Sequence, residues 1–279
     1  MKNKYLRSVK ISELKNLKVY LAIGVVAVVW GTTFLSIKIA VQTIPPWFVA
    51  GIRQFLAGLI LFLYLILTKK LRWIGWKNTF QQFLISSLML IVANGFTTLA
   101  EKHVTSSLAS LISSCTPILV FILSAIFIVK KINIRSLIGV LICFSGILFI
   151  FWDSLEDFLN ADYRTGLILM FLGISGWSIG TVYTKHVLLQ KGSIFLNLFY
   201  QFTFAGVVQI IFGFLFSPET NIHQWKLKGI LAVIYLAIFG SVIAFFCFNY
   251  LLQRLLPTQV AILSYVNTII AIFLGWLIL

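Results

Sequence analysis

Charged side chains are scarce in this sequence. Only 10% of the 279 residues are Asp, Glu, Lys or Arg, whereas 60% are hydrophobic. Soluble domains usually have about a quarter of their residues charged, so an ordinary water-soluble domain is excluded. The apolar residues fall into runs of about 20, the length that spans a bilayer as a helix. We therefore expect an all-α integral membrane protein that has the lipid bilayer as a partner.

Signatures of cofactor, metal or catalytic chemistry are also missing. The three cysteines, Cys115, Cys143 and Cys247, lie in apolar runs without metal-ligand spacing, so neither a disulfide nor a zinc site is predicted. No HExxH, GxSxG or P-loop motif is present, and the three histidines are scattered near the ends of apolar runs. We predict no enzyme activity, no cofactor and no metal, and we exclude ATP hydrolysis by this chain as an energy source.

Lysine and arginine outnumber the acids, with 22 against seven and a net charge of +15. A nucleic-acid partner is not predicted, because these residues are dispersed between apolar runs and not gathered on one face. Their distribution instead predicts topology, since cytoplasmic loops are rich in Lys and Arg. With the N-terminus inside, 16 basic residues fall on inner segments and four on outer connections, which also hold six of the seven acids. We expect a multi-pass plasma-membrane protein with a cytoplasmic N-terminus.

Nine apolar runs are long enough to be spans. They lie near 19–40, 47–68, 79–100, 106–129, 135–152, 165–188, 193–216, 228–252 and 258–279. Their continuous hydropathy predicts helices and not strands of a membrane barrel, which would alternate apolar and polar residues over about 10 positions.

Several residues recur at nearly constant separations, which indicates an internal repeat. Trp30, Lys38, Gln54 and Phe55 recur 147 residues later as Trp177, Lys185, Gln201 and Phe202, while Ala109, Leu111 and Thr116 recur 152 residues later as Ala261, Leu263 and Thr268. A repeat of five spans is odd in number, so its second copy must enter the membrane from the opposite side, as in many secondary transporters.

The repeat divides the chain into four parts. Residues 1–18 form a basic cytoplasmic tail, 19–152 a first five-helix repeat, 153–164 an acidic external linker, and 165–279 a second repeat with four helices. The fifth span would have its counterpart at about 287–304 if the separation of 152 continued. The sequence ends at Leu279, so we expect the tenth helix to be missing, with lower stability and activity as a result.

Two stretches resemble a known family. The first contains Trp30-Gly31-Thr32-Thr33-Phe34, followed by Lys38, Pro45-Pro46 and Arg53; the second contains Gly240-Ser241, Asn249-Tyr250, Arg254, Ala261, Ser264-Tyr265 and Gly275-Trp276. They are similar to EamA-type members of the drug/metabolite transporter superfamily. This resemblance implies ten helices in two five-helix repeats, and export of amino acids, related metabolites or drugs.

Two basic residues, Lys38 and Arg53, fall inside predicted spans, where a charge costs at least about 2.5 kcal/mol. Either both snorkel to the outer interface, or they form a positive vestibule that attracts a carboxylate or phosphate, with Lys185 as an inner counterpart. No acid is placed in a span interior, and Glu101 is placed only at a mouth. Transport without proton coupling, either facilitative or by exchange, is therefore expected.

Polar and aromatic residues supply the other candidates for a solute pathway. A helical stripe in the third span predicts Asn94 and Thr98, with either cavity lining or interhelical hydrogen bonding as its role. The full set of predicted pathway residues is Trp30, Lys38, Arg53, Asn94, Thr98, Trp177, Tyr183, Tyr200, Gln201 and Asn249. Small-residue spacing at Gly176 and Gly180 predicts close helix packing.

The predicted function is secondary transport of a small-molecule solute, such as an amino acid or an amphipathic drug-like compound, by alternating access. Two other classes stay open: a membrane scaffold or receptor, and an intramembrane lipid-modifying enzyme. The first does not account for the repeat, and the second would need buried acids, histidines or a nucleophile pair. A homodimer is compatible with the sequence.

Overall fold

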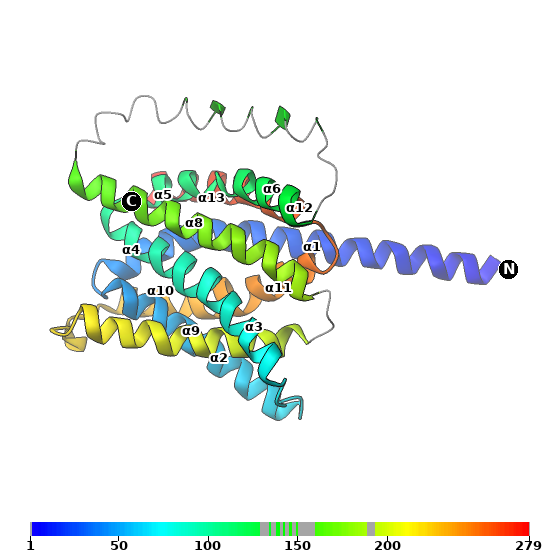
Figure 1. Ribbon diagram of the computed structural model, residues 1–279, viewed down its shortest axis with the longest axis horizontal. Coiled ribbons are helices and arrows are strands. Elements are labelled where there is room, and N and C mark those ends of the chain that lie inside the picture. The colour runs from blue at the N-terminus through cyan, green and yellow to red at the C-terminus, as the bar shows by residue number, and fades with distance from the viewer. Residues whose placement is uncertain are drawn as a thin grey trace.

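The computed structural model describes residues 2–128, 160–188 and 193–278, with a few isolated positions between 134 and 149. Regular structure in these residues is helical (Figure 1). Apart from those isolated positions, the predicted span 135–152 lies outside the described residues, and so does most of the predicted linker 153–164.

Eight helical segments of the described residues are long and apolar enough to cross a membrane. They are Leu17–Val41, Pro46–Leu67, Trp76–His103, Ser106–Phe127, Ala161–Val187, Ile194–Phe216, Leu227–Leu252 and Pro257–Ile278. Their bounds agree within a few residues with eight of the nine predicted spans. Large apolar side chains cover the outside of the bundle, as at Leu67 and Trp76, which are 83% and 81% exposed. The prediction of an all-α membrane protein is confirmed.

Four of the spans are single helices and four are interrupted. The single helices are α1 (Lys2–Val41), α2 (Pro46–Leu67), α8 (Ala161–Leu188) and α9 (Ile194–Phe216). The interrupted spans consist of α3 (Trp76–Ser86), η1 (Ser87–Asn94) and α4 (Gly95–His103); α5 (Ser106–Ser113) and α6 (Thr116–Phe127); α10 (Leu227–Tyr235), η4 (Leu236–Ile243) and α11 (Ala244–Leu252); and α12 (Pro257–Ala261) and α13 (Leu263–Ile278). Segments η1 and η4 are π-helical.

Prolines account for several helix starts. Pro46, Pro117 and Pro257 lie in the first turns of α2, α6 and α12. Proline has no backbone N–H to donate, so it is favoured where a helix begins and disfavoured within one. Thr105 adds a cap at the start of α5, where its hydroxyl accepts a hydrogen bond from the backbone N–H of Leu108.

Helices α2 and α9 pack with their backbones almost in contact. A Cβ atom added to Gly51 of α2 would lie 2.7 Å from the backbone nitrogen of Ile210, and one added to Gly206 of α9 would lie 2.7 Å from Cα of Phe55. Small residues at such positions let membrane helices approach closely and gain van der Waals contact. The predicted close packing at Gly176 and Gly180 is likewise confirmed, because a Cβ at Gly176 would lie 2.8 Å from the carbonyl oxygen of Leu88.

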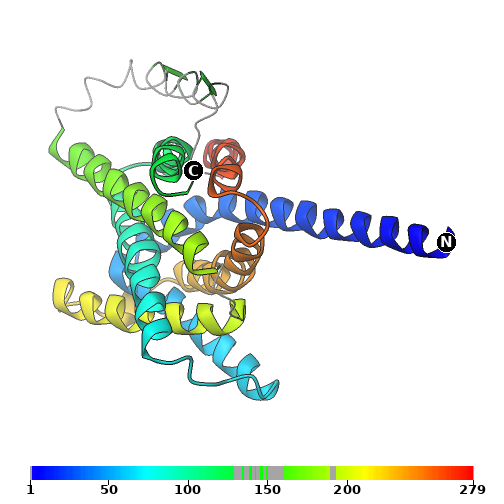
Figure 2. The ribbon, with the colours of Figure 1, turned by 45° about the vertical axis from the view of Figure 1, so that its right-hand side comes forward.

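Helix α1 runs through the bundle and contacts α13, α11 and α10. Its N-terminal part projects beyond the other helices (Figures 1 and 2). Helix α8 packs along η1 and α4 on one side and along α6 on the other. This arrangement brings the middle of α1 and the middle of α8 to one place in the interior, where Trp30 and Trp177 meet.

Candidate functional site

A cavity of about 120 Å³ lies in the centre of the bundle. Helices from both halves of the chain line it, namely α1, α2, η1, α4, α5, α6, α8, α11, α12 and α13. The lining residues are Trp30, Thr33, Phe34, Ile37, Arg53, Ala93, Asn94, Thr97, Ser113, Thr116, Gly173, Ile174, Trp177, Thr181, Phe245, Phe248, Val260, Ala261, Leu263, Ser264, Asn267 and Thr268.

One wall of the cavity is aromatic. The ring centroids of Trp30 and Trp177 lie 5.1 Å apart at an interplanar angle of 83°, and both rings contact Phe245 and Phe248. Edge-to-face packing of this kind is favourable and fixes ring positions. The indole nitrogen of Trp30 also donates a hydrogen bond of 3.1 Å to the carbonyl oxygen of Gly240. These contacts therefore connect α1, α8 and α11 along the aromatic wall.

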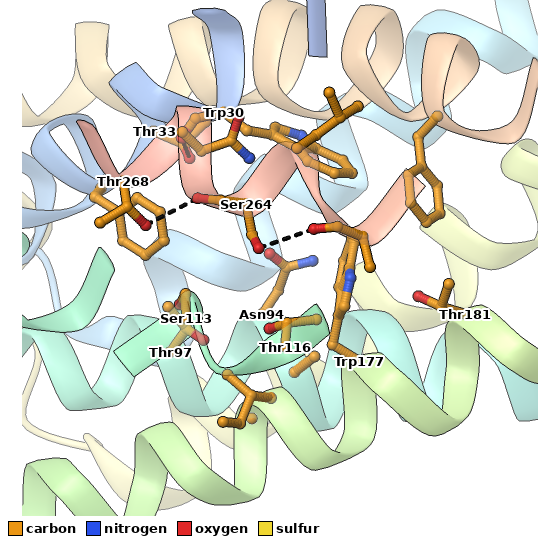
Figure 3. Close-up of a pocket in the computed structure, with 18 of the residues that line it drawn as sticks. Trp30, Thr33, Asn94, Thr97, Ser113, Thr116, Trp177, Thr181, Ser264 and Thr268 are labelled. Atoms are coloured by element: carbon orange, nitrogen blue, oxygen red, sulfur yellow. Dashed lines mark hydrogen bonds between the residues drawn. The ribbon is translucent and has the colours of Figure 1, made fainter. Parts of the chain in front are cut away.

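Hydroxyl and amide groups lie among the apolar residues that line the rest of the cavity (Figure 3). The hydroxyl of Thr268 lies within hydrogen-bond distance of the carbonyl oxygens of Ser264 and Ser110. Thr181 differs, because its Oγ1 has no hydrogen-bond partner among the described residues. A buried hydroxyl without a partner favours binding of a polar group.

Arg53 supplies the only charge among the lining residues, and its side chain is just 3% exposed. Its Nε donates to the hydroxyl of Ser241 at 2.9 Å, and that hydroxyl lies 3.3 Å from Oε1 of Gln54. A Cβ added at Gly240 would lie 3.2 Å from Nη2 of Arg53, so glycine leaves room for the guanidinium. A buried guanidinium suits a carboxylate or phosphate, which it can bind through two parallel hydrogen bonds.

Six of the ten predicted pathway residues do not line the cavity. Lys38 donates to two backbone carbonyls, Thr98 donates to the carbonyl of Asn94, and Asn249 donates to the carbonyl of Phe245. Tyr200 donates to the carbonyl of Arg72 near the surface, and Tyr183 packs against the central apolar cluster. Gln201 bridges α9 to α3 by donating to Oε1 of Gln82 at 2.6 Å. The other four, Trp30, Arg53, Asn94 and Trp177, lie on the cavity wall.

Lys38 and Lys185 each donate hydrogen bonds to backbone carbonyls at the end of another helix. Nζ of Lys38 donates to the carbonyls of Glu101 and Val104, at 2.7 and 2.8 Å, where α4 ends. Nζ of Lys185 donates to the carbonyls of Leu252 and Leu255, at 2.6 and 3.1 Å, where α11 ends. The last carbonyls of a helix lack partners within it, so a positive side chain there stabilises the helix end. The ammonium group of Lys38 is thus bound to the end of α4, a contact that neither predicted role of this residue includes.

The expectation that Glu101 lies only at a mouth is wrong. The third span continues to His103, beyond the predicted limit of 100, and the carboxyl side chain of Glu101 is 0% exposed. Helices α1, α2 and α8 pack against this part of α4 and cover it. Burial of the carboxyl therefore comes from contacts with distant segments.

Several residues that line the cavity were not among the predicted pathway residues, although a sequence pattern marked some of them. Thr116 and Thr268 are a repeat pair separated by 152 residues, and both line the cavity. Thr33 belongs to the stretch that carries the family resemblance, whereas Thr97 and Thr181 carried no signal, because threonine is common in membrane helices. Among the described residues no group of three or more His, Cys, Asp or Glu could hold a metal ion.

Comparison with known proteins identifies the family. The profile of the EamA-like transporter family matches the chain twice, over residues 17–152 and 164–279. The chain belongs to the EamA-like transporter family. The cavity therefore lies in a protein of a transporter family. The match also agrees with the resemblance noted at Trp30-Gly31-Thr32-Thr33-Phe34.

Relatives of this EamA-like transporter carry matching names. An uncharacterized inner membrane transporter of Escherichia coli K12, YedA, is 31% identical over 250 residues, which cover 89% of this chain and 78% of YedA. An uncharacterized transporter of Bacillus subtilis, YoaV, is 24% identical over 93% of this chain and 88% of its own. One solved crystal structure matches with a TM-score of 0.72 at 16% identity, covering 93% of this chain and 88% of that one, and so supports the fold.

Proposed function

We propose that this EamA-like transporter moves a small metabolite across the plasma membrane by alternating access, with the solute held in the central cavity. The observation that carries the proposal is the cavity itself, which is lined by helices from both halves of the chain. Solute sites of many secondary transporters lie near the bilayer midplane between two such halves, which then rock about the solute.

Cavity size and lining support a small amphipathic solute. The volume of about 120 Å³ is close to the roughly 150 Å³ of an engineered cavity that holds one benzene molecule. The aromatic wall of Trp30 and Trp177 suits an apolar part of the solute, whereas Arg53 and the Thr181 hydroxyl suit polar groups. An amino acid or a similar drug-like compound combines these features.

Paired element bounds support two repeats. Segments η1 and η4 each have eight residues and begin 149 residues apart, and α4 and α11 each have nine residues and are also offset by 149. Lys38 and Lys185, which are 147 residues apart, hold the ends of these paired helices. The family profile also matches each half of the chain separately, as expected for two copies of one unit. We propose repeats at 19–152 and 165–279, inverted with respect to each other.

The proposed topology has the basic tail, 1–18, in the cytoplasm and the linker, 153–164, outside. It rests on the 16 basic residues assigned to inner segments and the four assigned to outer ones. The positive charge of the tail would keep it on the cytoplasmic side.

An export screen tests the proposed function. Cells that overproduce the protein should release a particular metabolite or tolerate its toxic analogue, and Trp30→Ala or Asn94→Leu should abolish this at unchanged abundance in the membrane. The matched control is Trp76→Ala, since Trp76 is 81% exposed and distant from the cavity lining. Binding of a solute without movement would instead indicate a receptor, and full activity of both cavity variants would remove the cavity from the pathway.

A further inference from the structure

Glu101 has an unusual environment for a carboxyl group. Among the acids whose side chains the structure describes, only Glu101 is buried, while Asp162 and Glu219 are exposed. Neither Oε1 nor Oε2 of Glu101 has a hydrogen-bond partner among the described residues. Acidic residues inside membrane spans are rare and mark ion or proton sites.

Two cations face this carboxyl group from the helices around it. Lys38 of α1 and Arg53 of α2 are the charges that act on it, and neither donates a hydrogen bond to it. The other charged or titratable residues near this end of α4 are more exposed than Glu101: on α4 itself Lys102 is exposed and His103 is half-buried, and Asp162 and Arg164 of α8 are exposed. Asp162 lies 3.6 Å from His103. Helix α5 and segment η1 contribute no charged residue.

The second half of the chain lacks this carboxyl group. Lys185 holds the carbonyls of Leu252 and Leu255 as Lys38 holds those of Glu101 and Val104, and each pair of carbonyls is 151 residues from its counterpart. Leucine at position 252 gives the same backbone arrangement without a carboxyl. The helix-end contact therefore does not require a carboxyl side chain at position 101.

We propose that Glu101 is a proton-binding site coupled to the solute cavity through Arg53. The proposal rests on the proposed transport function and replaces the expectation of transport without proton coupling. In the ionised state the carboxylate is attracted by Lys38 and Arg53. In the protonated state it is neutral, and burying a neutral carboxyl group costs less than burying a charged one. The same site can therefore hold Glu101 in its ionised and in its protonated form.

Arg53 links the two sites because it lines the cavity and also acts on Glu101. An anionic group of the solute at the guanidinium would be repelled by an ionised Glu101, and a proton on Glu101 removes that repulsion. The proton and the anionic group thus favour each other's binding, and such coupling is reciprocal. The expected solute carries an anionic group and crosses together with a proton.

The protonation of Glu101 can be measured directly, without any solute. Infrared difference spectra of the full-length protein in lipid nanodiscs, taken between acidic and alkaline pH, should show the carbonyl band of a buried protonated carboxyl. Glu101→Gln should remove that band completely, while the matched control Glu219→Gln, at an exposed loop position, should keep it. A band that survives in Glu101→Gln, or a wild-type protein without a pH-dependent band, overturns the proposal. If Glu101→Gln does not fold, Glu101→Asp must shift the frequency of the band, and an unshifted band overturns the proposal equally.

A second measurement separates this proposal from the proposed function. Proteoliposomes containing a pH indicator receive the solute found in the export screen. Wild type should move protons with the solute, whereas Glu101→Gln should move solute with proton flux at the level of empty liposomes. Solute transport without proton flux in the wild type overturns proton coupling and leaves transport intact. A titrating Glu101 band in a protein that transports none of the screened solutes counts against the proposed function and supports the proton site.

Discussion

If the proposed function is right, Arg53 is the residue on which solute recognition depends most directly. Replacing it with Met keeps an apolar stem but removes the only charge on the cavity wall, together with the bond to Ser241. Hydrogen bonds to charged groups contribute about 1.5–3 kcal/mol, so we expect the apparent affinity for an anionic solute to fall by about 10- to 100-fold. Concentration dependence of uptake into proteoliposomes measures this.

The matched control for that substitution is Arg72→Met, because Arg72 is an exposed arginine in the loop between α2 and α3. Unchanged affinity in Arg53→Met, with normal transport, would show that the cavity does not bind the anionic group there. Arg53→Lys should recover affinity only in part, since an ammonium group cannot reproduce two parallel hydrogen bonds.

Sequence reasoning predicted the residues on the cavity wall unevenly. Arg53 and the tryptophans stand out as rare or repeated residues in apolar runs, and they do line the cavity. Two roles were predicted for Lys38, and neither includes its hydrogen bonds to the end of α4, which lies 63 and 66 residues away in the sequence. The burial of Glu101 was missed for the same reason, because it depends on three other helices.

At the scale of elements, the glycines between α2 and α9 are the most sensitive positions. Gly206→Val would put a Cβ 2.5 Å from the backbone nitrogen of Phe55 and force the two helices apart. Overpacking of this kind costs about 1–3 kcal/mol or more, so we expect a clear drop in the thermal unfolding temperature in detergent. Gly24→Val is the control, because a Cβ at Gly24 of α1 has nothing within 4 Å. Equal stability of the two variants would contradict the close packing.

The lysines that hold helix ends give a second prediction at this scale. Lys185→Met leaves the carbonyls of Leu252 and Leu255 without their donor, at the junction of α11 and α12. Leaving buried acceptors unpaired costs about 1–3 kcal/mol, so hydrogen exchange at this junction should become faster. Lys228→Met, at an exposed lysine in α10, serves as the control. Unchanged exchange would mean that Lys185 does not stabilise the junction.

Hydropathy predicted the spans well and their interruptions poorly. The predicted 228–252 matches the observed Leu227–Leu252, because a bilayer requires about 20 apolar residues whatever the tertiary structure. The π-helical segment η4 inside that span could not be predicted from its apolar content, and neither could η1. Such insertions are frequent at functional sites, and here Asn94, the last residue of η1, lines the cavity.

The topology of the whole molecule can be tested with two loops at equivalent places in the proposed repeats. Lys70 lies between α2 and α3, and Glu219 lies between α9 and α10; both are exposed. If the repeats are inverted, Lys70→Cys faces the cytoplasm and Glu219→Cys faces outside. An impermeant thiol reagent on intact cells should then label Glu219→Cys strongly and Lys70→Cys only after permeabilisation, whereas the native Cys115 and Cys247, which lie within spans, label weakly in both.

The same pair of variants also counts the spans between the loops. The described residues contain four spans between positions 70 and 219, which would return the chain to the side it left. A fifth span at 135–152 makes the number odd and places the loops on opposite sides of the membrane. Labelling of both cysteines from the same side would therefore exclude the fifth span and the inverted repeat together. Labelling from opposite sides, with Lys70→Cys inside, is the outcome expected from the nearby basic residues Lys69, Arg72 and Lys77, because cytoplasmic loops are rich in Lys and Arg.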